Sequence, residues 1–164
     1  MKKIIKHYLL FVCCVSANVY ACEVDLCKAD EMVIASCRLS ETKGRVVSFC
    51  ASANKKTISY RVGSNSDPEM NIQFSNKKPV SRWLDVGTYT TYFGFRRAAY
   101  SYVLGVPQES LGARAFLEVA KNDKILTSVD CVDNSYGEKN IDSEAIINVQ
   151  DDLVRSNGFL FPPY

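Results

Sequence analysis

The residues best suited to acid–base chemistry are two pairs of aspartates, Asp130 with Asp133 and Asp151 with Asp152. Two carboxylates can hydrolyse a glycoside when they face each other across a cleft at about 5–9.5 Å. Neighbouring aspartates on a helix or loop usually face water instead. We therefore predict that neither pair is catalytic, and a carboxylate-based hydrolase is the weakest of the functions considered.

The chain has one histidine, His7, so residues 8–164 contain none. Without it, the remaining residues lack the commonest general base, the Ser-His-Asp triad and histidine metal ligands. The sequence has no phosphate-binding glycine loop, dinucleotide motif or metal-ligand cluster. We predict that the protein is not an enzyme and has no metal or cofactor.

The first 21 residues have the features of a secretory signal peptide. Lys2, Lys3 and Lys6 precede a short apolar run at residues 8–15, and modest side chains follow at residues 19–21. That run is too short to span a membrane. We predict a signal peptide at 1–21 and a single secreted domain at 22–164, with no transmembrane segment. This domain carries 17 Lys and Arg against 18 Asp and Glu, so nucleic acid is not an expected partner.

The cysteines indicate disulfide bonds, as is usual in exported chains. Two of the seven, Cys13 and Cys14, lie in the predicted signal peptide, and the other five are Cys22, Cys27, Cys37, Cys50 and Cys131. Cys37 and Cys50 would lie opposite each other in a hairpin centred between Lys43 and Gly44, which favours a bond between them. Cys131 is the alternative partner for either one.

Cys22 directly follows the predicted cleavage site, where the acylated cysteine of a bacterial lipoprotein would stand. Lipidation there would leave an even number of cysteines. The bulky Tyr20 and the presence of Val19 instead of leucine favour simple cleavage. The expected location is the periplasm or the exterior, and a lipid tether at Cys22 is the alternative.

Alternating apolar and polar residues predict strands along most of the domain. The fold expected is mainly β, an antiparallel meander of about eight strands that forms a barrel or a sandwich. The eight segments are 31–39, 45–51, 57–63, 69–75, 81–96, 99–106, 113–120 and 125–131. Within the long segment 81–96, Gly87 and Gly94 suggest bulges or bends.

One helix is predicted at 143–156, capped by Asp142 or Ser143 and stopped by Gly158. Its β-branched residues, among them Ile146 and Ile147, oppose that assignment. The apolar tail at 159–164 is expected to dock on the domain.

Aromatic residues are dense between Trp83 and Tyr102. Strand alternation predicts one face with Tyr89, Phe93 and Phe95, which we assign to packing. The other face and the adjoining turn hold Tyr92, Arg96 and Arg97, residue types that anchor interfaces. We predict this edge as a binding surface.

The polar loop at Gly63–Pro68 is a second candidate binding surface. Ser64, Asn65 and Ser66 could project into the cleft of a partner, although a turn of this composition needs no function to explain it.

Several stretches resemble a group of small exported bacterial proteins of unknown function: CRL at 37–39, RVVSFC at 45–50 and ISYRVG at 58–63, with Trp83 and Cys131. More coarsely, the architecture is similar to that of bacterial lysozyme inhibitors, which are small disulfide-bonded β-barrels of the periplasm. Those inhibitors insert a serine- and glycine-rich loop into lysozyme. Residues 64–66 match that loop only loosely, so the resemblance assigns no site residue.

These observations predict a periplasmic or cell-envelope binding protein without catalysis, whose partner is a protein. An inhibitor or immunity protein against a cell-wall hydrolase is the form we expect, and a structural or assembly lipoprotein of the envelope is the alternative.

Overall fold

The computed structural model describes residues 23–64 and 67–164, so Cys22, Asn65, Ser66 and the predicted signal peptide lie outside it. Mainly β structure is confirmed, but the described residues form ten strands instead of about eight. In chain order these are β1 (Glu31–Arg38), β2 (Val46–Ser52), β3 (Ile58–Ser64), β4 (Asp67–Phe74), β5 (Val80–Asp85), β6 (Thr90–Arg97), β7 (Tyr100–Val106), β8 (Phe116–Lys121), β9 (Lys124–Asp130) and β10 (Ile146–Val149), followed by the helix α1 (Asp151–Ser156).

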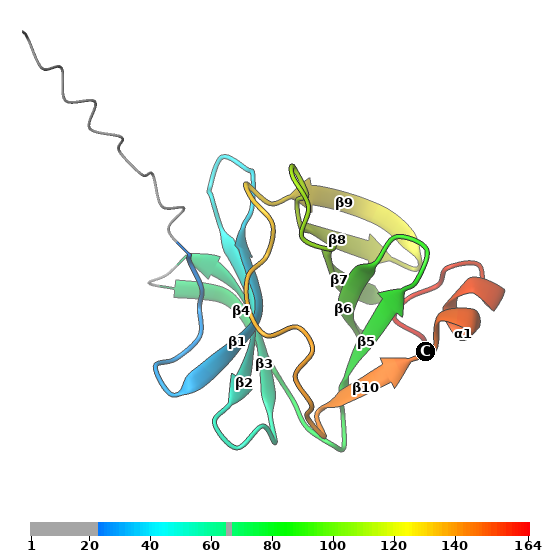
Figure 1. Cartoon of the computed structure of the whole chain (residues 1–164), viewed down its shortest axis with the longest axis horizontal. Coiled ribbons are helices and arrows are strands. Elements are labelled where there is room, and N and C mark those ends of the chain that lie inside the picture. Colours follow the sequence, from blue (N-terminus) through cyan, green and yellow to red (C-terminus); the bar gives the residue numbers. More distant parts are fainter. Residues whose placement is uncertain (1–22, 65–66) are drawn as a thin grey trace, which may run out of the picture.

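The strands form two sheets that pack as a sandwich (Figure 1). The first sheet has the order β1-β2-β3-β4, and the second has the order β10-β5-β6-β7-β8-β9. Within the described residues the strands do not close into a barrel. Consecutive strands of each sheet pair antiparallel, as predicted, whereas β10 pairs parallel to β5.

Large apolar side chains from the inner faces of both sheets make the core. Phe49 contacts Phe93 across the sheets with ring centroids 5.5 Å apart, and Tyr60 contacts Phe95 at 4.9 Å. These side chains share the inner faces because successive residues of a strand point to opposite faces of its sheet.

The predicted helix at 143–156 is wrong over its first half. Ile146–Val149 is strand β10, and α1 has only six residues, with Gln150 and not Asp142 or Ser143 before its first turn. β-branched side chains favour the pleated conformation, and the edge of β5 supplies hydrogen-bond partners. The helix ends as expected before Gly158, whose φ is +69°. In the described residues no helix has the length and apolar character to cross a membrane.

The predicted Cys37–Cys50 bond is also wrong, because the hairpin register differs. Cys37 lies opposite Val47 in the β1–β2 pair. The strands are joined by a seven-residue connection, closed by a hydrogen bond from the Leu39 amide to the Arg45 carbonyl, in place of a tight turn. The two disulfides are Cys27–Cys50 and Cys37–Cys131, with Cα atoms 5.5 and 5.9 Å apart.

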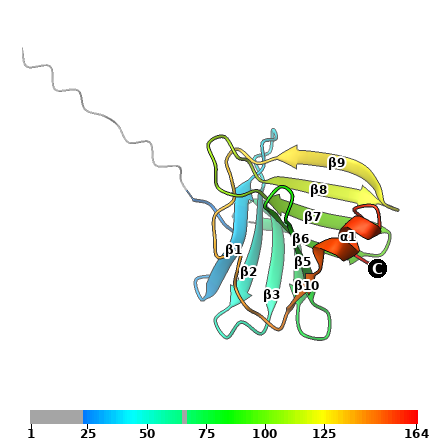
Figure 2. The same ribbon diagram turned by 45° about the vertical axis from the view of Figure 1, so that its right-hand side comes forward.

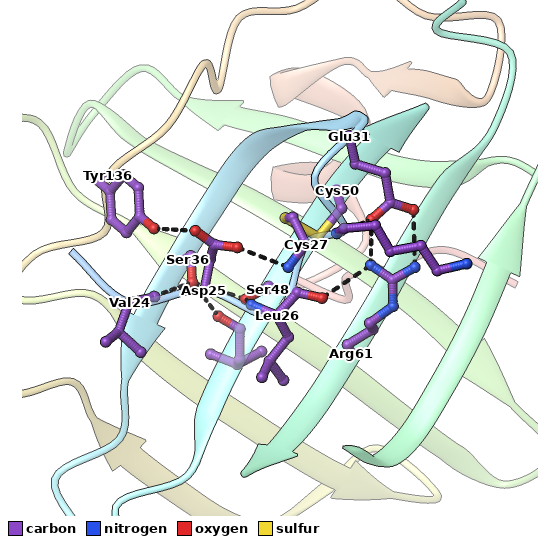
Figure 3. Close-up of a disulfide and its surroundings, with 12 residues drawn as sticks. Val24, Asp25, Leu26, Cys27, Glu31, Ser36, Ser48, Cys50, Arg61 and Tyr136 are labelled. Carbon is purple, nitrogen blue, oxygen red and sulfur yellow. Dashed lines mark hydrogen bonds and ion pairs between the residues drawn. A yellow bond between two sulfur atoms is a disulfide. The ribbon is translucent and has the colours of Figure 1, made fainter. Parts of the chain in front are cut away.

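The Cys27–Cys50 bond fixes the N-terminal segment, residues 23–28, across the outer face of the first sheet (Figure 3). The Leu26 amide donates to Ser48 Oγ at 3.0 Å, and Ser36 Oγ donates to the Val24 carbonyl at 2.8 Å. These bonds add to those that the two buried serines make within the sheet, where Ser36 Oγ lies 2.8 Å from Ser48 Oγ.

The C-terminal tail docks on the outer face of the second sheet, beside α1 and β10 (Figure 2). Phe161 packs on Trp83 and Tyr92, and Pro162 is fully buried. A Cβ atom on Gly94 would lie 2.7 Å from Phe161 Cε1. Gly94 is therefore not at a bulge, since the register of β6 is regular there; it makes room for the tail.

A candidate binding cavity between the sheets

A cavity of about 270 Å³ lies between the sheets, at the end where the β1–β2 connection and the β3–β4 hairpin lie. Its walls are mostly apolar. The first sheet and its connections supply Leu39, Tyr60, Val62 and Met70, and the second sheet supplies Tyr102, Leu117, Val119, Thr127 and Val129. A pocket of this kind, apolar with few polar groups, is the usual form of a small-ligand site.

Tyr60 is the most deeply buried of the polar side chains that line this cavity. Its side chain is 1% exposed, and its ring is held between Phe49 and Phe95 at centroid distances of 5.1 and 4.9 Å. The hydroxyl has no hydrogen-bond partner among the described residues. A buried hydroxyl without a partner costs about 1–3 kcal/mol, so the fold tolerates an unmet hydrogen bond at this position.

The electrostatics of Tyr60 agree with its place in the cavity. Burial raises the pKa of the hydroxyl well above its usual value, Tyr102 adds to this rise, and the charge of Arg45 opposes it. Arg45 and Tyr102 line the same cavity as Tyr60.

Three charged side chains surround the mouth of the cavity. Arg45 Nε lies 2.5 Å from Glu41 Oε1, and Arg45 Nη1 lies 2.9 Å from Glu69 Oε2. Hydrogen bonds from Arg45 hold the pKa of Glu41 below its usual value. Two carboxylates face one guanidinium, so this ion triad carries a net charge of −1.

The predicted aromatic–arginine edge is divided between two faces of β6. On the outer face, Tyr92 stacks on Trp83 at 4.5 Å, and Arg96 donates to the Pro162 carbonyl at 2.8 Å and lies 2.9 Å from Asp123. Arg97 is exposed on the opposite face. Burial raises the pKa of Tyr92, and Asp85 adds to the rise. Tyr92 and Arg96 thus hold the C-terminal tail, and the binding role of all three stays a prediction.

Tyr89 does not share the face of Phe93 and Phe95, as the alternation predicted. It lies in the β5–β6 turn with φ of +52° and is 60% exposed. Ser64 ends β3, two residues beyond Val62 in the cavity wall. The predicted loop therefore begins close to the cavity mouth, although Asn65 and Ser66 lie outside the described residues.

The aspartates of the two predicted pairs lie in different surroundings. Both oxygens of Asp151 are engaged, Oδ1 by Trp83 Nε1 and Oδ2 by Arg155 Nε, each at 2.8 Å. Asp152, Asp130 and Asp133 are exposed. Ligand atoms of Cys27, Glu31 and Cys50 lie within 4.8 Å of one another, but the disulfide occupies both sulfurs.

Sequence reasoning missed the residues of this cavity. The alternation of Ile58, Tyr60 and Val62 predicts a buried face, and a hydroxyl on that face is the one signal that could have pointed to a polar site. The ion triad depends on contacts between Arg45 and Glu69, 24 positions apart, which no local pattern encodes.

Comparison with family models, with curated proteins and with solved structures gives no match for this chain. The resemblances noted from the sequence therefore stay predictions.

Proposed function

We propose that this chain is a non-catalytic binding protein of an oxidising compartment outside the cytoplasm, in the periplasm or beyond the cell, and that the cavity between the sheets is its binding site. The observation that carries the proposal is the buried Tyr60 hydroxyl, which lacks a hydrogen-bond partner in the described structure beside an apolar cavity. The two disulfides support an oxidising compartment, because such bonds form and persist outside the cytoplasm. A lipid tether at Cys22 is the alternative form of the same proposal.

The test uses the full-length protein, exported by its own N-terminal segment and purified with both disulfides intact. It is mixed with an organic extract of the cell envelope, separated from free material, and extracted again for mass spectrometry. Val129→Phe places a large side chain in the cavity, and Ile147→Phe makes a similar change at an exposed site on β10.

We expect wild type and Ile147→Phe to retain the same small molecule and Val129→Phe to lose it. Retention of nothing by wild type, or equal retention by Val129→Phe, would remove the cavity from the proposed function.

A protein partner, such as a cell-wall hydrolase, is the second candidate. The observation in its favour is β9, the last strand of the second sheet in the described structure, on which Ile125 and Leu126 are 62% and 59% exposed. An edge of this kind can accept an extended segment of another protein. Inhibition of a panel of purified lysozymes tests it, with Ile125→Lys expected to abolish inhibition and Val129→Phe to preserve it.

A further inference from the structure

The cavity contains features that restrict the chemistry of its ligand. The Tyr60 hydroxyl can both donate and accept a hydrogen bond. It is buried and has no partner within residues 23–64 and 67–164, so a ligand oxygen that reaches it after a small shift of the surrounding side chains would satisfy it without displacing an existing bond. The ligand therefore needs one hydrogen-bonding group at the end that reaches Tyr60.

The walls limit the body of the ligand. Leu39 and Leu117 are buried and apolar, and Met70 and Val129 extend the same surface toward the mouth. A cavity of about 150 Å³ holds a benzene ring. The cavity here measures about 270 Å³, which suits two fused rings or an aliphatic group of similar size.

The mouth limits the charge of the ligand. Arg45 has its Nε, Nη1 and Nη2 donors directed to Glu41 and Glu69, so its positive charge is already paired. An anionic ligand would meet two carboxylates around this one guanidinium and would lose hydration without gaining a free cation. Uncharged molecules avoid this penalty.

We propose that the cavity binds a small, uncharged, largely apolar molecule of about two fused rings, oriented by one hydroxyl or carbonyl oxygen at Tyr60. This inference rests on the proposed function, because it assumes that the cavity is a binding site, and it adds the chemical class of the ligand.

The test measures binding of three matched probes by equilibrium dialysis at pH 7. The probes are 2-naphthol, which is uncharged and has a hydroxyl, naphthalene, which lacks it, and 2-naphthoate, which is an anion. The proteins are the oxidised exported wild type, Tyr60→Phe and Tyr100→Phe. The last variant removes the same hydroxyl from a tyrosine that does not line the cavity.

Wild type and Tyr100→Phe are expected to bind 2-naphthol about five- to tenfold more tightly than naphthalene, the range of one net hydrogen bond. In Tyr60→Phe the two affinities should agree within about twofold. Binding of 2-naphthoate should be at least tenfold weaker than that of 2-naphthol in all three proteins.

Equal affinities for naphthalene and 2-naphthol in wild type, or a preference that persists in Tyr60→Phe, would overturn the role of Tyr60. Tight binding of 2-naphthoate would overturn the requirement for an uncharged ligand. If wild type binds none of the probes but retains an envelope molecule that Val129→Phe loses, the ligand class is wrong while the proposed function stands. If Val129→Phe retains that molecule too, both fail.

Discussion

The guanidinium of Arg61 is buried on the outer face of the first sheet, beneath the N-terminal segment (Figure 3). It contacts both carboxylate oxygens of Glu31, at 2.5 and 2.9 Å, and donates to the Leu26 carbonyl at 3.1 Å. A buried ion pair of this kind gains little over an apolar pair, but loss of one partner leaves an uncompensated charge.

Glu31→Gln should therefore destabilise the protein by about 3 kcal/mol, because Arg61 would stay charged and buried. Glu31→Leu combined with Arg61→Met should cost less than the single change, since no charge is left behind. Urea unfolding followed by far-ultraviolet circular dichroism measures both. A double variant that is less stable than Glu31→Gln would mean that the pair itself stabilises the fold.

The same pair predicts a dependence of stability on pH. Burial alone would raise the pKa of Glu31, but the hydrogen bonds and charge of Arg61, together with the Lys28 amide, outweigh burial and hold the pKa below its usual value. A lowered pKa in the folded state means that the stabilisation is complete above the ordinary value of 4.5 and is lost as the pH falls through the folded value.

Wild type should lose more stability than Glu31→Gln between pH 5 and pH 3, measured as the free energy of unfolding in urea at each pH. The lowered pKa values of Glu41 and Asp151 act in the same direction in both proteins, so the difference between the two curves reports Glu31 alone. Parallel curves would show that the pair does not contribute to acid sensitivity.

At the scale of elements, the C-terminal tail completes the outer face of the second sheet. Trp83, the only tryptophan of the chain, packs against Tyr92 and Phe161 and donates its Nε1 proton to Asp151. Its fluorescence therefore reports whether the tail is docked.

Phe161→Ala should shift the emission of Trp83 to longer wavelength and cost about 2 kcal/mol, because the ring that covers the indole is lost. Phe159→Ala is the matched control, since Phe159 belongs to the same tail but is 58% exposed. An unchanged spectrum in Phe161→Ala would mean that α1 and β10 shield Trp83 without the tail.

Most strands were predictable from sequence. Several carry a two-residue period, as in Ile58, Tyr60 and Val62, and others are short runs rich in β-branched and aromatic residues. The strand at 146–149 was not predicted. It forms by parallel pairing with β5, which lies more than 60 residues earlier in the chain. Tail docking was correctly expected from the apolar composition of residues 159–164.

The candidate site was far less predictable than the strands. Tyr92 and Arg96 attract notice as typical interface residues, yet the tail of the same chain already uses them. Tyr60 appears in the sequence as one more aromatic residue on a buried strand face. Only the arrangement of two sheets reveals that its hydroxyl lacks a partner in the described structure, because satisfaction of a hydrogen bond is a property of the packed molecule.

At the scale of the whole molecule, the disulfides have different tasks. Cys27–Cys50 fastens a segment to the sheet beneath it and closes a loop of 23 residues, whereas Cys37–Cys131 joins β1 of the first sheet to the end of β9 in the second and closes a loop of 94. Beyond Cys131 the chain continues along β1, where Ser36 pairs with Tyr136. The second bond thus ties the two sheets together at the point where the chain crosses between them.

Replacing both cysteines of a pair by alanine should therefore have unequal effects. The entropy of loop closure predicts a loss of about 3.4 kcal/mol for Cys27–Cys50 and about 4.7 kcal/mol for Cys37–Cys131. Chemical denaturation of the two double variants, under oxidising conditions that keep the other bond intact, measures the difference. A larger loss for Cys27–Cys50 would contradict this order and would show that the N-terminal segment, and not the joint between the sheets, is the main support of the fold. The order expected here follows from the lengths of the two loops, because the bond that closes the longer loop removes more conformational freedom from the unfolded chain.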